Sequence, residues 1–92
     1  MTPRQAEFIA LRAIEWLVAQ DEILPVFMGA TGCQEADFRT QVADSDFQGS
    51  VLDFILMDDA WVQSFCAAMD VGPHDVYPAR HSLPGAQTPH WT

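Results

Sequence analysis

The stretch Ser45–Asp59, SDFQGSVLDFILMDD, decides the fold class of this 92-residue chain. Ser45 and Gln48 have the spacing of a capping box, in which a hydroxyl and a side-chain amide satisfy free backbone N–H groups at a helix start. Asp53 is the single charge within residues 47–57, so apolar side chains nearly encircle the expected helix. These side chains are Phe47, Val51, Leu52, Phe54, Ile55, Leu56 and Met57. We expect this helix to be central and the most buried.

Three helices are expected before this stretch. Thr2 and Pro3 have the preferred chemistry of an N-cap and of a first helical position. Asp21 is the expected cap of the second helix, and Gly32 has the residue type that commonly ends one. The three helices are expected over residues 3–19, 22–31 and 35–42.

Two further helices are expected after this stretch. Asp58 or Asp59 can cap the first of them, which runs through Met69. The last helix covers residues 73–82, and Pro78 should kink or split it because proline cannot donate a backbone hydrogen bond. No segment keeps a strand-like alternation over six residues with turn residues at both ends. The sequence therefore predicts an all-α fold, a compact bundle of about six short helices.

The chain also resembles itself at an offset of 38 residues, without a gap. Four identities occur in this register: Asp21 with Asp59, Phe27 with Phe65, Ala30 with Ala68, and Asp37 with Asp75. Repeats of this length are typical of stacked or paired helical units. We expect two pseudo-symmetric three-helix units, about 9–44 and 47–82, in a single helical domain of residues 1–85 with a flexible tail at 86–92. A chance match of two amphipathic stretches is the alternative.

Several short motifs carry a resemblance to a known family. They are the block Val51–Asp59, the links Thr31-Gly32 and Val71-Gly72 with the Asp37-Phe38-Arg39 and Asp75-Val76 that follow them, and the ending Leu83-Pro84-Gly85. With them the sequence resembles a small all-helical alphaproteobacterial family known only as a domain of unknown function. Pro78 departs from that pattern. The resemblance implies an all-helical fold, and it carries no information about an activity.

Composition excludes several classes of partner. The chain has 13 acidic residues against 4 basic ones, all arginine, and a net charge of -9. Such a charge repels phosphate, which disfavours nucleic acid and anionic membrane surfaces and favours basic proteins or cationic ligands. The chain also lacks an apolar run of membrane-spanning length and a signal-peptide pattern, so we expect a cytoplasmic protein. Cys33 and Cys66 fit reduced thiols there, with a disulfide as the less favoured alternative.

Catalytic and metal-binding patterns are weak. His74 and His81 are spaced by two helical turns, but no His/Cys spacing matches a zinc pattern. Residues 44–49 begin like a calcium loop, yet Ile55 stands where a bidentate glutamate is needed. Acid pairs such as Asp58-Asp59 are explained by helix capping. We therefore expect no cofactor, no metal and no enzymatic activity.

One apolar surface suggests a function. Pro25, Met28 and Gly29 lie on a helix without a polar face, and Phe8 and Trp16 lie within or beside a polar arc. We hypothesise that these five residues form an interaction surface for a protein partner or for a second copy in a homodimer. The surface could instead be buried or covered by tail residues such as Trp91. The alternative function is small-ligand or metal binding, between the repeats or near the C-terminal histidines.

Overall fold

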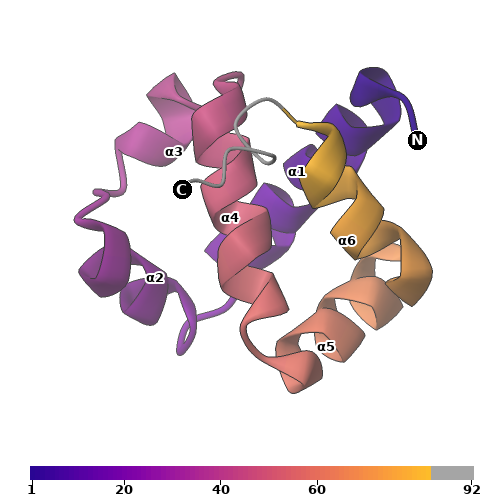
Figure 1. Cartoon of the computed structure of the whole chain (residues 1–92). Coiled ribbons are helices and arrows are strands. Elements are labelled where there is room, and N and C mark those ends of the chain that lie inside the picture. Colours follow the sequence, from indigo (N-terminus) through magenta and orange to yellow (C-terminus); the bar gives the residue numbers. More distant parts are fainter. Residues whose placement is uncertain (84–92) are drawn as a thin grey trace, which may run out of the picture.

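A computed structural model describes residues 1–83 of the chain, and its helices are shown in Figure 1. The element order is α1 (Pro3–Val18), α2 (Leu24–Thr31), α3 (Asp37–Thr40), α4 (Ser45–Leu56), α5 (Asp59–Met69) and α6 (Pro73–Ser82). Residues 1–83 contain no strand, so the predicted all-α bundle of about six short helices is confirmed. None of these helices is both long and apolar enough to cross a membrane. The predictions for residues 84–92, including the tail and the ending at Gly85, lie outside the described residues.

Side-chain caps define the start of three helices. At α1, the Gln5 N–H donates to the Thr2 hydroxyl (3.2 Å) and the Thr2 N–H donates to the Gln5 side-chain oxygen (3.0 Å), which confirms this helix start. The Ala60 N–H donates to the Asp58 carboxylate at 2.8 Å, so Asp58 rather than Asp59 caps α5. At α4, the Phe47 N–H donates to the Asp44 carboxylate at 3.0 Å.

The predicted capping box of Ser45 and Gln48 is therefore wrong. Because Asp44 is the cap, α4 begins one residue earlier than the box requires, and Gln48 lies one position too far along the helix. Its side chain is 2% exposed and its amide donates to the Val42 carbonyl at 2.8 Å. Gln48 thus ties α4 to the segment after α3.

The helices α2 and α3 are shorter than predicted. Asp21 does not cap α2, because residues 21–23 form turns and the helix begins at Leu24. Pro25 has no N–H to donate to the Asp21 carbonyl, so a helix from residue 22 would lack its first hydrogen bond. Helix α3 spans only four residues, and the Asp37 carboxylate accepts from the Gln34 N–H at 2.8 Å in the turn before it.

Helix α6 is not split at Pro78. It runs from Pro73 to Ser82 with Pro78 in its interior, and its Val76 and Ala79 side chains are fully buried. Burial on both sides of the proline holds the helix against the core, which offsets the lost backbone hydrogen bond.

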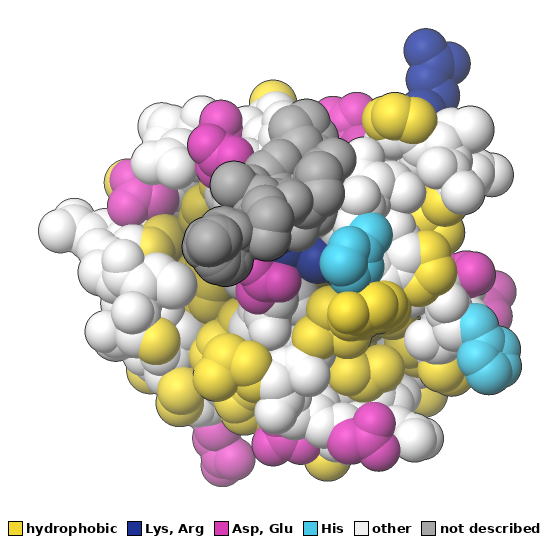
Figure 2. Space-filling model, viewed as in Figure 1, with side chains coloured by type: hydrophobic (Ala, Val, Ile, Leu, Met, Phe, Trp, Pro, Cys, Tyr) yellow, Lys and Arg dark blue, Asp and Glu magenta, His cyan; other side chains and the backbone are white. Residues whose placement is uncertain are grey.

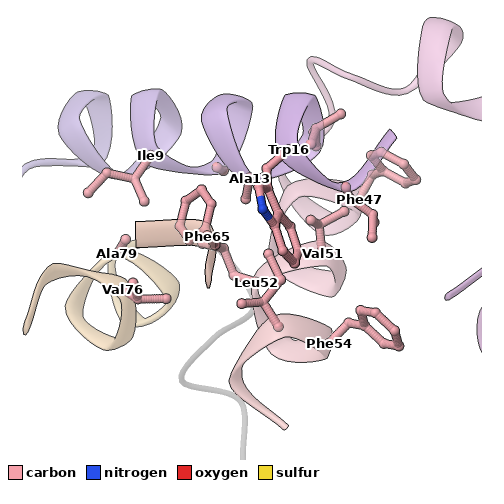
Figure 3. Close-up of a cluster of buried hydrophobic side chains, with 14 of the residues drawn as sticks. Ile9, Ala13, Trp16, Phe47, Val51, Leu52, Phe54, Phe65, Val76 and Ala79 are labelled. Carbon is pink, nitrogen blue, oxygen red and sulfur yellow. The ribbon is translucent and has the colours of Figure 1, made fainter. Parts of the chain in front are cut away.

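Helices α1, α4, α5 and α6 pack against one another in every pairwise combination. At their centre Trp16 and Phe65 meet edge-on with ring centroids 5.9 Å apart (Figure 3). Helices α2 and α3 join this core through Phe27 and Phe38, which make edge-on contacts with Phe54 and Phe47 of α4. Seven of the 12 residues of α4 are buried, the largest share of any helix, as its apolar sequence predicts.

The two predicted repeat units match in part of their local structure. At the offset of 38, the C-terminal ends of α1 and α4 coincide, as do those of α2 and α5, whereas the helix starts differ by four and three residues. Gly32 and Asp70, which follow α2 and α5, both adopt the left-handed conformation, with φ of 75° and 57°. Six positions of α1 and the six equivalents in α4 are all buried: 9, 10, 13, 14, 16 and 17 against 47, 48, 51, 52, 54 and 55. A duplication would produce such agreements, and the duplication stays a prediction.

Candidate functional site

The structure separates the five residues of the predicted interaction surface. Phe8 is 58% exposed on α1, as expected for an apolar residue in a polar arc. Trp16 is only 2% exposed, so its assignment to a surface is wrong. The helical periodicity places Trp16 at the edge of the buried arc, and α5 covers that edge with Phe65.

The three residues of α2 form a second, separate region. Pro25 and Gly29 are exposed, whereas Met28 is half-buried and packs against the core. In Figure 1, α2 lies on the side of the molecule opposite the N-terminal turns of α1, where Phe8 is found. The expected single patch over the first two helices is therefore two patches.

Phe8 lines a groove on the surface of residues 1–83. This groove, which we call the Phe8 groove, has a volume of about 790 Å³ and lies between the start of α1 and the link from α5 to α6. Its lining is mostly apolar and comprises Met1, Arg4, Gln5, Phe8, Ile9, Asp70, Val71, Gly72, Asp75 and Pro78. The groove thus lies between the N-terminal turns of α1 and the second predicted repeat unit.

The wall formed by the α5–α6 link has a defined backbone. Asp70 ends α5 in the left-handed conformation, and the Val71 N–H donates back to the Cys66 carbonyl at 3.1 Å. Gly72 then starts α6, where the Asp75 N–H donates to the Gly72 carbonyl at 2.9 Å. These bonds fix the positions from which two carboxylates line the groove.

Phe8 itself is held by a neighbour on its own helix. The Arg12 guanidinium lies over the Phe8 ring, 5.2 Å from its centroid, and Arg12 is also 4.0 Å from Glu15. A cation over an aromatic face stabilises both side chains. An exposed phenylalanine is thereby kept in place at the edge of the groove without being buried.

Charges on the two walls of the Phe8 groove differ. Asp70 and Asp75 lie on the link wall, and Arg4 lies on the α1 wall. The ion pairs within residues 1–83 are Arg12–Glu15 and Arg80–Asp53, so none of the three lining charges is paired there.

A second, smaller groove occupies the equivalent place in the other half. It has a volume of about 290 Å³ and lies between the α2–α3 link and the start of α4 (lining residues Phe27, Thr31, Gly32, Cys33, Asp37, Gln41, Asp44, Asp46, Phe47 and Ser50). Five of these are 38-residue equivalents of residues in the Phe8 groove: Gly32, Cys33, Asp37, Asp46 and Phe47. We call this the Asp46 groove, because Asp46 occupies the position of Phe8.

The two cysteines are free thiols. Burial raises the pKa of the Cys66 thiol, and the negative charge of Asp75 raises it further. Burial likewise raises the pKa of Cys33, to which the charge and hydrogen bonding of Asp37 add. A raised pKa lowers the fraction of reactive thiolate at neutral pH, so neither cysteine has the environment of a nucleophile.

Other predicted chemistry finds structural explanations. His74 and His81 are both exposed on α6, where the His81 ring lies 4.4 Å from that of Tyr77. Within residues 1–83 no three side chains of His, Cys, Asp or Glu are grouped so that they could hold a metal ion. The segment that begins like a calcium loop is the cap and first turn of α4.

Comparison with known proteins identifies the family. Residues 3–86 match the family described as "Protein of unknown function (DUF3572)", and the chain belongs to this family. Neither a curated protein nor a solved structure matches the chain.

Proposed function

We propose that this DUF3572 member is a non-enzymatic protein-interaction module of the cytoplasm and that the Phe8 groove is its docking surface. The observation that carries the proposal is the exposed ring of Phe8 at the edge of a groove of about 790 Å³. Isolated apolar residues are common on protein surfaces, but an aromatic side chain beside a concave apolar lining is typical of an interaction site.

The remaining side-chain chemistry supports a binding role. Asp44 and Asp58 are occupied as helix caps, and the pKa values of both thiols are raised. Groove binding needs none of these groups, because helical segments dock through apolar anchors placed one turn apart.

Capture from native lysate tests the proposal. Tagged wild-type protein should capture a partner, identified by quantitative mass spectrometry, and Phe8→Asp should lose it. The matched control is Val26→Asp on α2, which also replaces an apolar residue about half exposed (51%) and should retain the partner. Equal capture by wild type and Phe8→Asp would contradict the proposal, and loss with Val26→Asp alone would move the site to α2.

The groove volume also supports a second candidate function, the binding of a small molecule between the repeat units. A volume of about 790 Å³ falls in the range of small-molecule sites. A compound that raises the melting temperature of the wild type, but not that of Phe8→Asp, would favour this function over protein docking.

A further inference from the structure

Resting on the proposed function, we infer that the Phe8 groove takes a basic amphipathic segment of a partner protein. Apolar side chains of this segment pack against Phe8 and its neighbours, and a lysine or arginine beside them faces Asp70 and Asp75.

The apolar half of the inference rests on the lining of the groove. Phe8 and Ile9 come from α1, and Val71 and Pro78 come from the opposite wall. Ile9 is 8% exposed and belongs to the core, whereas Phe8 is 58% exposed. A partner side chain in the groove would therefore bury the exposed ring and extend the existing core outward.

The basic half rests on charge complementarity. Both acidic residues of the lining lie on the link wall, where Asp70 is exposed at the left-handed end of α5 and Asp75 is exposed in the first turn of α6. Arg4 is the one arginine of the lining and lies on the α1 side with Met1 and its ammonium group, so the link wall is the side that a partner cation would face. The net charge of -9 adds a field that attracts cationic segments over longer distances.

The same charges argue against a second copy of this chain as the occupant. A homodimer would bring two bodies of net charge -9 into contact, and like charges disfavour that encounter. A basic segment instead gains from the field of the whole molecule as well as from the two aspartates of the link wall.

The Asp46 groove is an internal control for this inference. It is acidic, with Asp37, Asp44 and Asp46 in its lining, but its volume is about 290 Å³ and it has an aspartate where the first has Phe8. The Asp44 and Asp37 carboxylates already accept backbone hydrogen bonds there. We therefore expect no equivalent docking in the Asp46 groove, although its lining is acidic.

The test uses a displayed library of random 16-residue peptides, selected on the wild-type protein and counter-selected on Phe8→Asp. Enriched peptides should be net positive, with lysine or arginine next to apolar residues at helical spacing. Their dissociation constants are then measured on variants of the full chain. Asp70→Asn should weaken binding about two- to fivefold, the size of one exposed ion pair. Asparagine also tolerates the left-handed backbone there.

Two further variants should change the dissociation constant differently from Asp70→Asn. Arg4→Gln removes the cation of the opposite wall and should leave binding unchanged or tighten it by up to about twofold. Asp46→Asn removes an equal charge from the other groove and should leave the dissociation constant unchanged. Affinity should fall as salt is added, because the attraction is screened.

Several results would overturn the inference. Enriched peptides of neutral or negative charge would do so, as would the absence of any Phe8-dependent peptide. Weakening by both Arg4→Gln and Asp70→Asn would instead indicate an occupant with both charges, such as a second copy. If lysate capture still depends on Phe8 in any of these cases, the proposed interaction function stands and only the basic partner is rejected.

Discussion

In the first half of the chain Phe27 packs against Phe54 of the second half, and in the second half Phe65 packs against Trp16 of the first. The ring centroids are 5.2 Å apart in one pair and 5.9 Å in the other, and both pairs are edge-on. At the offset of 38 residues each pair is the equivalent of the other with the halves exchanged. A two-fold interface between the halves would give such a reciprocal contact. The helix packing is less symmetric, because α5 and α6 pack on both α1 and α4 whereas their counterparts α2 and α3 pack on them much less.

The two halves differ where they meet solvent. Helix α6 is ten residues long and packs on α1 and α4, whereas its counterpart α3 has four residues. The groove beside Phe8 is large and mostly apolar, and the equivalent groove beside Asp46 is small and acidic. Figure 2 shows that, on the face it displays, apolar and acidic side chains are both exposed. The two halves therefore agree in buried positions of α1 and α4 and differ in the surfaces beside Phe8 and Asp46.

The largest expected effects test the reciprocal core. Phe27→Ala and Phe65→Ala each remove a fully buried ring. Each should lower the free energy of unfolding by about 3–5 kcal/mol, a large fraction of the stability of a small domain. Urea unfolding measures both, with Phe→Leu at the same positions if the alanine variants do not fold. A loss below about 1 kcal/mol at one of the two positions, with a large loss at the other, would show that the halves are not equivalent in stability.

The next effect concerns the two left-handed helix ends. Gly32 has φ of 75° with open space around its Cα, so Gly32→Ala strains only the backbone and should cost about 1 kcal/mol. Asp70→Gly at the equivalent position, with φ of 57°, should be neutral or stabilising by up to about 1 kcal/mol. Thermal unfolding measures the change in stability of each variant. A clear loss of stability in both would contradict the equivalence of the two left-handed helix ends.

A smaller effect separates two equivalent acids. Asp53 pairs with Arg80 at 2.6 Å, and the Arg80 side chain is 17% exposed, so Asp53→Asn leaves a mostly buried guanidinium without its partner. We expect a loss of about 1 kcal/mol. Its counterpart Glu15 is 4.0 Å from Arg12 in an exposed pair, and Glu15→Gln should cost no more than about 0.3 kcal/mol. Urea unfolding at low salt measures the loss of stability in each variant. Equal losses would show that burial of the Arg80 guanidinium does not strengthen its pairing with Asp53.

The smallest effect is the pH dependence from the thiols. Burial raises the pKa of Cys33 and Cys66 above the ordinary value of 9.0, so the folded state binds their protons more tightly than the unfolded state. Their contribution is therefore complete below pH 9.0 and is lost as the pH rises through the folded pKa. A Cys33→Ser, Cys66→Ala variant should lose stability less steeply than the wild type above pH 9.0. Identical slopes of stability against pH in the variant and the wild type would contradict this prediction.

The sequence predicted the helices best where caps and apolar periodicity agree. Thr2 and the apolar run of α4 are examples, and the offset of 38 aligns cap and core residues in the sequence alone. It failed where two signals competed. Asp44 and Ser45 are both good caps, and the structure distinguishes them by the Phe47 N–H bond to Asp44 and by the direction of Gln48 toward Val42. At Asp21, the missing N–H of Pro25 outweighed a good cap residue.

The candidate site was only half predictable. Phe8 stood out because an apolar residue in a polar arc is visible in one helix alone. The opposite wall of its groove lies more than 60 residues away, and the sequence signal for it was the link Val71-Gly72, whose role is structural. Trp16 misled because its burial depends on α5, which no property of α1 reveals.

We propose that the Phe8 groove, and not the Asp46 groove, binds a partner. Titration of the isotope-labelled chain with a groove-selected basic peptide, followed by amide chemical shifts, locates the binding surface. We expect the largest shifts at residues 4–9 and 70–78, the two walls of the groove. Shifts centred on residues 31–50, the Asp46 groove, or on the exposed face of α2 would contradict it.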